Sequence, residues 1–341
     1  MAALAATTLA LAACSSSSSS SSTTPSTSPS ASPSASPKPM HIAYMSFAVD
    51  NTYDAPMLAA AQAVADTYGA TLKVFDADNS PQTQYDELQT VINSGQYNGI
   101  ITQPIESTSL VSLVEEAIAK GIKVVNMDQI LGPALDTDAP QVTGLSANVT
   151  FVPTTIGTQL GQQVVAACAS KSLNPCKVGY LYDIKDSSLD TAIYGAFTAA
   201  IKGSPVKVVT YGQSYFTPAI GLTAVETMLA AQPTLNLIVG SDQGIEGAMT
   251  ALTTTDKSYS GKLLLVGYGA SAAAVAGVEA GTIFSDVAQA PASEGRLAVQ
   301  ALVEALQTGK VSGAINPVAG LPDGGIVTKA DASQFTPEWP G

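Results

Sequence analysis

From residue 41 onward, short apolar runs alternate with longer amphipathic stretches, and this alternation constrains the fold more than any other feature of the chain. The apolar runs suit strands that are buried on both faces, and the stretches between them suit helices of ten or more residues. The pattern predicts a parallel sheet covered by helices on both sides. In the first part of the chain we expect strands at 41–47, 71–76, 99–103 and 123–127, and helices at 56–68, 80–94 and 107–120.

The same alternation continues through most of the remaining chain. Ten strands in roughly 300 residues are more than one sheet usually holds, so we expect an α/β protein with two doubly wound parallel-sheet lobes. No linker-like segment divides the lobes, and we therefore expect short hinge segments between them. The further strands are expected at 142–146, 178–182, 206–211, 235–240, 263–268 and 283–289, and the further helices at 153–169, 187–201, 219–231, 244–253, 271–280 and 292–308.

Residues 1–14 form an apolar run that ends at Cys14, which is typical of a bacterial lipoprotein signal followed by the cysteine that receives lipid. The run is shorter than the about 20 residues that a transmembrane helix needs. It holds no Lys or Arg, so we expect the true start codon to lie upstream. We interpret the Ser/Pro-rich stretch at 15–40 as a disordered tether that holds a globular body off a membrane. The alternative is a disordered tail on a cytosolic protein with a buried Cys14.

Acidic residues outnumber basic ones, with 27 Asp and Glu against 14 Lys and Arg and a formal net charge of -13. Such a chain repels phosphate backbones, so we expect no nucleic-acid partner. Arg296 is the single arginine, and arginine is the usual residue for bidentate capture of carboxylate or phosphate. Anionic substrates are therefore disfavoured as well. Only 12% of the residues are charged, so the surface relies on Ser, Thr, Gln, Asn and Gly for its polarity.

Cys168 and Cys176 are the only cysteines after the N-terminal segment, and the residues between them end in Asn174–Pro175, a typical turn. This spacing favours a disulfide that joins the end of a helix to the start of the next strand, provided the Cα atoms come within about 7 Å. Two independent thiols are the alternative. Two cysteines and the single histidine, His41, cannot form a structural zinc site, and we expect no metal.

Several segments, in this order and spacing, resemble the sugar-binding branch of the type I periplasmic solute-binding proteins. They are 50–54 (DNTYD), 76–81 (DADNSP), 101–104 (ITQP), 124–129 (VVNMDQ), 239–243 (VGSDQ), 266–269 (VGYG) and 287–291 (VAQAP). Together they cover about 42–312, nearly the whole folded part of the chain. The resemblance implies the periplasmic binding protein type I fold, whose two lobes are joined by a three-crossing hinge. The crossings are expected near 146–148, 289–290 and 313–316, with lobes formed by 41–147 plus 290–314 and by 148–289 plus 315–335.

In that family the ligand lies between the lobes at the carboxyl ends of the strands, which is where open α/β sheets place ligands. Carried over by position, the resemblance implies a pocket of acids, amides and rings. These groups suit the hydroxyls and the apolar C–H face of a sugar. The first lobe is expected to contribute Asn51, Tyr53, Asp54, Asp128 and Gln129, and the second lobe Phe216, Asp242, Tyr268 with Gly269, and Gln289 at a hinge.

The chain departs from ribose-binding-type proteins where these carry charged groups. Gln129 stands in place of one arginine, Asp190 and Thr191 stand near the place of another, and Gly269 stands in place of an aspartate. A pocket that holds acids and no arginine is expected to bind a neutral polyol or, as the alternative, an amine-bearing ligand. We expect it to reject sugar phosphates and sugar acids.

The expected ligand residues also have structural interpretations. Asp54 and Asp242 precede helices and could cap them. Asp128 follows a strand with no obvious helix to cap, which favours a ligand contact. Tyr53 and Phe216 could be ordinary packing residues. The amide of Gln289 could serve only to satisfy backbone groups at the hinge.

Other chemistries have little support in the sequence. Residues 267–272 match a G-x-G-x-x-A dinucleotide fingerprint, but no acid ends a second strand about 20 residues later, so we interpret them as a tight turn and expect no cofactor. No hydrolase elbow, zinc-protease motif or complete calcium loop is present. His41 is expected at the surface, and the neighbouring acids Asp136 and Asp138 are expected to be solvated. We expect no enzyme.

The residues and the resemblance together predict a lipid-anchored, extracytoplasmic receptor of an ABC importer for a monosaccharide or related polyol. We expect a monomer whose lobes close on the ligand and present the closed shape to a membrane permease. The alternative is a sensor of the same fold that presents a small signalling molecule or an amine-bearing ligand to a membrane receptor. Trp339, the only tryptophan, lies in the C-terminal tail and is expected to report poorly on binding.

Overall fold

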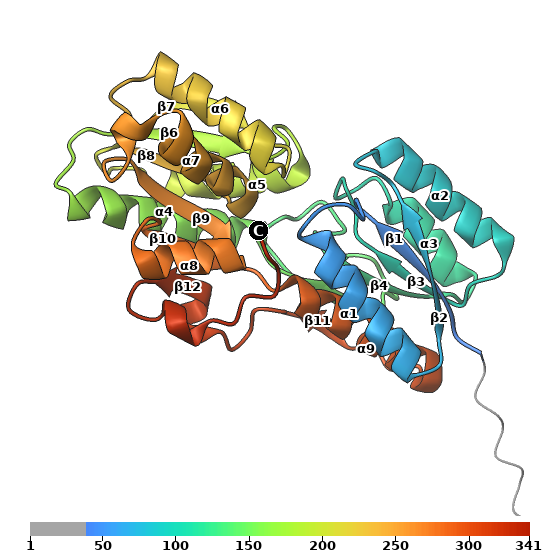
Figure 1. The fold of residues 1–341 in the computed structure, drawn as a ribbon. Helices are drawn as coiled ribbons and strands as arrows, with labels where there is room; N and C mark the ends of the chain where they lie inside the picture. Colours follow the sequence, from blue (N-terminus) through green and yellow to red (C-terminus); the bar gives the residue numbers. More distant parts are fainter. Residues whose placement is uncertain (1–38) are drawn as a thin grey trace, which may run out of the picture. The chain divides into compact units, whose positions relative to one another are not determined.

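The computed structural model describes residues 39–341, which belong to a compact unit that begins at Lys38 (Figure 1). The lipoprotein signal expected at 1–14, with its lipid-attachment residue Cys14, lies outside the described residues. So does the tether expected at 15–40, except for its last two residues. Within 39–341, no helix is both long and apolar enough to cross a bilayer.

Six strands form the first sheet. They are β1 His41–Ser46, β2 Thr71–Asp76, β3 Gly99–Thr102, β4 Lys123–Asp128, β5 Ala147–Thr150 and β11 Gly313–Ile315. Their order is β11-β5-β4-β3-β1-β2, and all neighbours are parallel. The central strands β1, β3 and β4 are buried along nearly their whole length, as expected for a parallel sheet with both faces covered.

Four helices cover this sheet, and together they form what we call the first lobe. They are α1 Asp54–Thr67, α2 Pro81–Ser94, α3 Val111–Ala119 and α9 Pro291–Thr308. Apolar side chains of α1 and α9 pack on one face of the sheet, and those of α2 and α3 pack on the other. The expected start of α2 is confirmed, because the Ser80 hydroxyl accepts a hydrogen bond from the Thr83 backbone N–H at 3.2 Å and Pro81 follows in the first turn.

The second sheet also has six strands. They are β6 Cys176–Tyr182, β7 Val206–Gln213, β8 Leu237–Ser241, β9 Leu264–Gly269, β10 Ser285–Ala288 and β12 Ile326–Thr328. Their order is β12-β10-β9-β8-β6-β7. All neighbours are parallel except β12, an edge strand that runs antiparallel to β10. The alternating pattern did not predict β12, which has only three residues.

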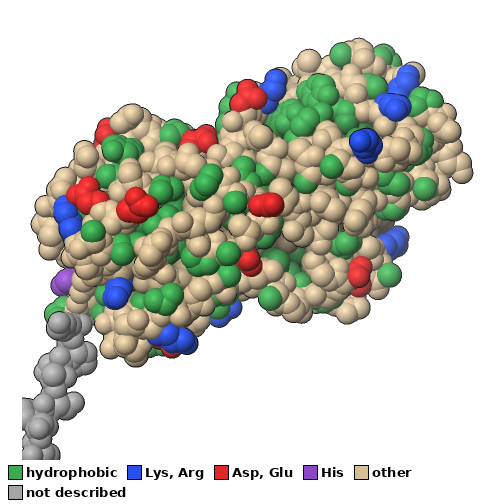
Figure 2. Space-filling model, turned by 180° about the vertical axis from the view of Figure 1, so that it is seen from behind, with side chains coloured by type: hydrophobic (Ala, Val, Ile, Leu, Met, Phe, Trp, Pro, Cys, Tyr) green, Lys and Arg blue, Asp and Glu red, His purple; other side chains and the backbone are tan. Residues whose placement is uncertain are grey.

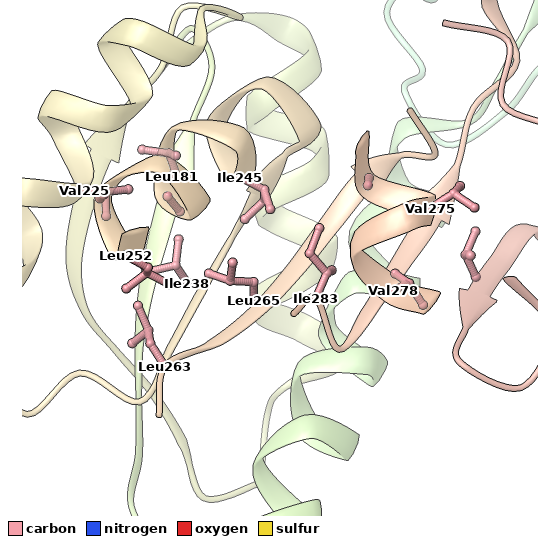
Figure 3. Close-up of a cluster of buried hydrophobic side chains, with 14 of the residues drawn as sticks. Leu181, Val225, Ile238, Ile245, Leu252, Leu263, Leu265, Val275, Val278 and Ile283 are labelled. Atoms are coloured by element: carbon pink, nitrogen blue, oxygen red, sulfur yellow. The ribbon is translucent and has the colours of Figure 1, made fainter. Parts of the chain in front are cut away.

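Five helices cover the second sheet and complete the second lobe. They are α4 Pro153–Ser170, α5 Ser188–Ala200, α6 Pro218–Ala231, α7 Asp242–Thr254 and α8 Ala272–Ala280. Side chains of α4 and α5 fill one face of the sheet. On the other face, α6, α7 and α8 contribute Val225, Ile245 and Val275 to a cluster with strand residues such as Ile238 (Figure 3). Short 3-10 turns occur at Lys257–Tyr259, Pro322–Gly325 and Ala332–Gln334.

One expected strand is wrong. Residues 142–146 form a bend and turn, and the strand begins at Ala147. Val142 and Leu145 are apolar because they pack into the first-lobe core from this turn. The apolar pattern missed the true strand because this strand carries the buried polar residues Asn148 and Thr150. The Asn148 side chain forms hydrogen bonds with the Asn126 side chain and the Asp138 carbonyl.

The chain passes between the two sheets three times, after β5, after β10 and after β11. The crossing at 289–290 lies where it was expected. Because β5 belongs to the first sheet, the first crossing follows Thr150, and the boundary expected between 147 and 148 falls inside this strand. The third crossing follows Ile315, at the edge of the expected 313–316.

A disulfide joins Cys168, near the end of α4, to Cys176, the first residue of β6, with 5.9 Å between the Cα atoms. The expected pairing is confirmed, and it fastens a helix to the strand that follows it.

Figure 2 shows one face of the molecular surface, on which charged side chains are scattered among a majority of uncharged groups. His41 is exposed at the start of β1, as expected, and its Nδ1 lies 2.8 Å from the Thr71 hydroxyl.

Candidate functional site

The carboxyl ends of strands from both sheets surround a small cavity. In each sheet the first strand lies between two others: β1 between β3 and β2, and β6 between β8 and β7. Open α/β sheets bind ligands at such points, where the strand order reverses. The cavity is lined by Phe47, Asn51, Tyr53, Asp54, Gln103, Asp128, Gln129, Phe151, Leu189, Phe216, Ser241, Gln243, Tyr268, Gln289 and Trp339.

On the first-lobe side, Gln103 connects two acids. This residue follows β3, and its Nε2 donates to Asp54 Oδ1 at 2.6 Å and to Asp128 Oδ2 at 3.0 Å. Its Oε1 accepts from the Phe47 backbone N–H at 3.0 Å, and its carbonyl accepts from Gln84 Nε2 at 2.8 Å. The amide is therefore fixed in one orientation, which holds the ends of β1, β3 and β4 in register around the cavity.

A third acid lies behind these two. Glu294, in the first turn of α9, is fully buried and accepts a hydrogen bond from the Tyr53 hydroxyl at 3.0 Å. In the described part of the chain, its second oxygen and the buried Tyr44 hydroxyl have no hydrogen-bond partner.

Burial raises the pKa of all three acids. The pKa of Asp54 lies well above its ordinary value because of burial and the nearby Asp128 charge, and that of Glu294 does so for the same two reasons. Burial raises the pKa of Asp128 to about 6, against the opposing effect of the hydrogen bond from Gln103. At neutral pH ionised Asp128 is an acceptor, whereas burial disfavours the charged forms of Asp54 and Glu294. Carboxyl groups of this kind suit sugar hydroxyls, which both donate and accept.

On the second-lobe side, Asp183 organises two of the lining hydroxyls. This buried residue follows β6, and its carboxylate accepts hydrogen bonds from Ser214 Oγ at 2.5 Å, Ser241 Oγ at 2.6 Å and Tyr268 OH at 2.5 Å. Burial raises the pKa of Asp183, whereas these three hydrogen bonds favour its ionised form. The result is a fixed orientation for Ser241 and Tyr268 at the cavity surface.

Aromatic rings from both lobes face the cavity. The rings of Phe47, in the first lobe, and Phe216, in the second, meet edge to face with centroids 6.3 Å apart. Tyr53 and Trp339 meet in the same way at 5.3 Å. Such rings can cover the apolar C–H face of a sugar ring.

Eight of the nine expected ligand residues line the cavity, namely Asn51, Tyr53, Asp54, Asp128, Gln129, Phe216, Tyr268 and Gln289. Asp54 does not cap α1, because its carboxylate is bonded to Gln103 and no side chain caps that helix. The Asn51 side chain accepts from the Tyr53 backbone N–H at 2.8 Å and shapes the turn before α1. Ligand contact by these residues stays a prediction.

The structure places the ninth residue, Asp242, outside the lining. As the first residue of α7 it turns toward the end of β9. Its Oδ2 accepts from the backbone N–H of Ser271, just before α8, at 2.6 Å, and its other oxygen faces buried Asp286 in β10. Gly267 leaves room for this pair of carboxyl groups, since a Cβ there would collide with both. The neighbours of Asp242 in the chain, Ser241 and Gln243, line the cavity instead.

Several residues in or behind the cavity wall were not expected, and four of them make hydrogen bonds that shape the site. Gln103 and Asp183 directly follow strands, and Asp128 ends one, so the same rule applied to β3 and β6 would have found them. Glu294 is a helix residue far along the chain, and Trp339 belongs to the C-terminal tail. Neither has a local sequence signal.

Two curated relatives align with nearly three quarters of this chain. Ribose import binding protein RbsB of Bacillus subtilis is 25% identical over 249 residues, which cover 73% of this chain and 75% of that protein. The D-allose-binding periplasmic protein of Escherichia coli is 27% identical over 258 residues, which cover 72% of this chain and 78% of that protein.

Solved structures show the same fold. A galactofuranose binding protein superposes with a TM-score of 0.73 at 18% identity, covering 87% of this chain and 97% of its own. The Caulobacter myo-inositol binding protein superposes with a TM-score of 0.72 at 18% identity, covering 90% and 98%. Residues 42–310 match the family described as periplasmic binding protein domain, and this chain therefore belongs to that family.

Proposed function

We propose that this chain is the extracytoplasmic substrate-binding protein of an ABC importer and that it binds a neutral monosaccharide or polyol between its lobes. The cavity is the observation that carries the proposal. Carboxyl, amide and aromatic side chains from both lobes line it, and its lining, drawn from residues 39–341, includes no Lys, Arg or His. The names of the relatives, which bind ribose or D-allose, support a sugar ligand and a role in import.

The proposed transport role includes parts of the chain outside the cavity. Lipid on Cys14 would anchor the protein to the outer side of the cell membrane, and the stretch at 15–40 would give it reach. The protein would act as a monomer that delivers its ligand to a membrane permease. It would release the ligand chemically unchanged.

Closure of the lobes is the proposed mechanism. A sugar bonded to Asp128 on one side and to Tyr268 or Ser241 on the other makes all its contacts only when the lobes are together. Binding therefore shifts the population of conformations toward the closed form. The permease would recognise that form.

Calorimetry and thermal denaturation with a panel of pentoses, hexoses, inositols and tetritols test the proposal. A ligand at 100 times its dissociation constant should add about 2.7 kcal/mol to the free energy of unfolding. We expect at least one neutral member to bind and hexuronates and sugar phosphates to fail, because ionised Asp128 repels anions. Micromolar binding of a hexuronate or a sugar phosphate, or no binding by any neutral member, would contradict the proposal.

One observation favours an amine-bearing ligand as the second candidate. Asp54, Asp128 and Glu294 are buried together without a cationic partner among the residues that bond to them. An ammonium group would supply that partner. Amino sugars and polyamines therefore belong in the panel, and their binding in preference to neutral sugars would favour this candidate or a sensor of the same fold.

A further inference from the structure

The last four residues, 338–341, run back from the second lobe to the cavity. They lie beyond residues 42–310, the part of the chain that matches the family. Figure 1 shows the chain end near the start of α8, where the Ala272 backbone N–H donates to the Trp339 carbonyl at 2.9 Å and the Ala273 N–H donates to the Pro340 carbonyl at 3.1 Å. The first turn of a second-lobe helix thus holds the tail.

The tail is also held by the first lobe. The Glu338 carboxylate accepts hydrogen bonds from the Ser293 backbone N–H at 2.7 Å and from its hydroxyl at 2.6 Å. Ser293 lies in the first turn of α9, where free N–H groups and the helix dipole favour a negative charge. The tail therefore joins two helix N-termini, one in each lobe.

Between these two attachments, the Trp339 side chain enters the cavity wall. It is only 4% exposed, and its Nε1 donates to the Gly269 carbonyl at 2.8 Å. Its ring meets Tyr53 edge to face at 5.3 Å. Gly269 has a φ of +141°, and a Cβ there would lie 2.6 Å from Trp339 Cζ2 and 2.8 Å from Asp242 Oδ2, so this position must be glycine for the indole and the carboxylate to fit.

The indole forms one wall of the cavity. Because the indole N–H is already bonded to Gly269, the ring offers only carbon atoms to a neighbour. A wall of this kind attracts the apolar face of a sugar and repels its hydroxyls.

We propose that the C-terminal tail is part of the ligand site and that Trp339 determines specificity by covering one C–H face of the bound sugar. This inference rests on the proposed binding of a sugar in the cavity. Sugars whose hydroxyl would point at the indole are rejected, since that hydroxyl would lose its hydrogen bonds to water without gaining a partner. Glu338 acts as a positioning residue that keeps the indole in place when the lobes are closed.

The experiment uses the full chain and the neutral sugars that calorimetry shows to bind. Trp339 is the only tryptophan, so its emission spectrum reports on this wall without labelling. We expect saturation with sugar to change the emission and to reduce quenching by acrylamide. We expect Trp339→Ala to raise Kd at least tenfold and to narrow the differences in Kd among the sugars, and Trp339→Phe to have a smaller effect on both.

Three further variants distinguish the effect of the Trp339 wall on binding from a general loss of stability. Gly269→Ala presses on both the indole and the Asp242 carboxylate and should weaken binding as Trp339→Ala does. Gly203→Ala, at another left-handed glycine but with open space around it, is the matched control and should leave Kd unchanged. Thr336→Ala, at an exposed tail position, is the control for the tail itself.

The outcomes distinguish this inference from the proposed function. If no neutral sugar binds by calorimetry, the proposed function fails and this inference falls with it. If sugars bind but the emission does not change and Trp339→Ala binds within twofold of the unaltered chain, only this inference is overturned. Tighter binding by Trp339→Ala would also overturn this inference, since the indole would then occupy the space of the sugar and not contact it.

Discussion

Two residues at the cavity, Asp128 and Phe216, have left-handed backbone conformations, with φ of +61° and +52°. Side chains other than Gly and Asn or Asp seldom adopt this conformation, and such strain tends to gather at functional sites. Asp128 is the last residue of β4, Phe216 lies three residues after the end of β7, and both side chains line the cavity. Local strain at Phe216 is thus accepted where it brings a ring to the site.

The raised pKa of Asp128 predicts an unusual dependence of stability on pH. Its folded-state pKa of about 6 exceeds its ordinary value of 3.8, so the folded state binds the proton more tightly than the unfolded state does. The stabilisation is fully present below about pH 4 and is lost as the pH rises through 6, and it amounts to roughly 3 kcal/mol. We expect Asp128→Asn, which retains the left-handed backbone, to lose less stability between pH 4.5 and pH 7 than the unaltered chain does. Urea denaturation of the two ligand-free proteins at both pH values measures the free energy of unfolding. An equal decrease in the two proteins would contradict the prediction.

The three hydrogen bonds to Asp183 predict that replacing one of its carboxylate oxygens with an amide nitrogen lowers stability. In Asp183→Asn an amide nitrogen replaces an oxygen that accepts from hydroxyl groups, so at least one buried donor loses its partner. The free energy of unfolding should fall by about 1–3 kcal/mol, as measured by urea denaturation. Asp186→Asn is the matched control, because Asp186 is exposed and its φ of +72° suits asparagine. A loss of equal size in the control would refute the assignment of Asp183 as an organising residue.

The residue scale also shows how far the sequence could predict the site. Asp128, Phe216 and Tyr268 line the cavity as the positions carried over from the resemblance implied. Asp242 was misplaced because the boundary between a strand and a helix decides which way a side chain turns, and here a shift of one residue exchanges it for Ser241 or Gln243. Trp339 could not be found at all, since its contacts with Gly269 and Tyr53 join positions far apart in the chain.

At the scale of elements, close helix contact depends on particular glycines. Gly157 in α4 faces α5, and a Cβ there would fall far inside contact distance of the Ile193 carbonyl oxygen. Gly195 in α5 is exposed and has open space where a Cβ would be. The same residue type thus has opposite roles in a pair of helices that pack together.

This difference predicts opposite results for one substitution at two positions. Gly157→Ala must separate α4 from α5 and should lower the free energy of unfolding by about 1–3 kcal/mol. Gly195→Ala should raise it by up to about 1 kcal/mol, because alanine favours helix more than glycine does. Thermal and urea denaturation of the two variants measure the changes. Destabilisation of similar size at both positions would show that the helix contact is not what requires Gly157.

Elements were predicted best where apolar pattern and burial agree. The parallel strands β1, β3 and β4 carry continuous apolar runs because both their faces are covered. The pattern failed at β5, where Asn148 and Thr150 are buried but satisfied by hydrogen bonds. A strand that carries buried polar residues resembles a loop in its sequence, and only the tertiary contacts of those residues distinguish such a strand from a loop.

At the scale of the whole molecule, a few contacts hold the lobes together at the cavity mouth. Ser188, at the start of α5, donates to Glu106 Oε2 at 2.9 Å and accepts from the Ser107 backbone N–H at 3.3 Å. The Phe47 and Phe216 rings meet nearby. Since these contacts exist only when the lobes are closed, they affect the balance between open and closed forms and not the core of either lobe.

Removing the Ser188 hydroxyl should therefore weaken ligand binding without loosening the fold. The lost hydrogen bonds are worth about 0.5–1.5 kcal/mol in the closed form, so Ser188→Ala should raise Kd roughly two- to tenfold, mainly through faster dissociation. The free energy of unfolding of each ligand-free lobe core should stay within about 0.5 kcal/mol. Thr198→Ala is the matched control on the same helix, because its hydroxyl bonds only the Gly195 carbonyl in the second lobe. Calorimetry and stopped-flow dissociation measure both variants, and an unchanged Kd in Ser188→Ala would mean that closure does not depend on this contact between the lobes.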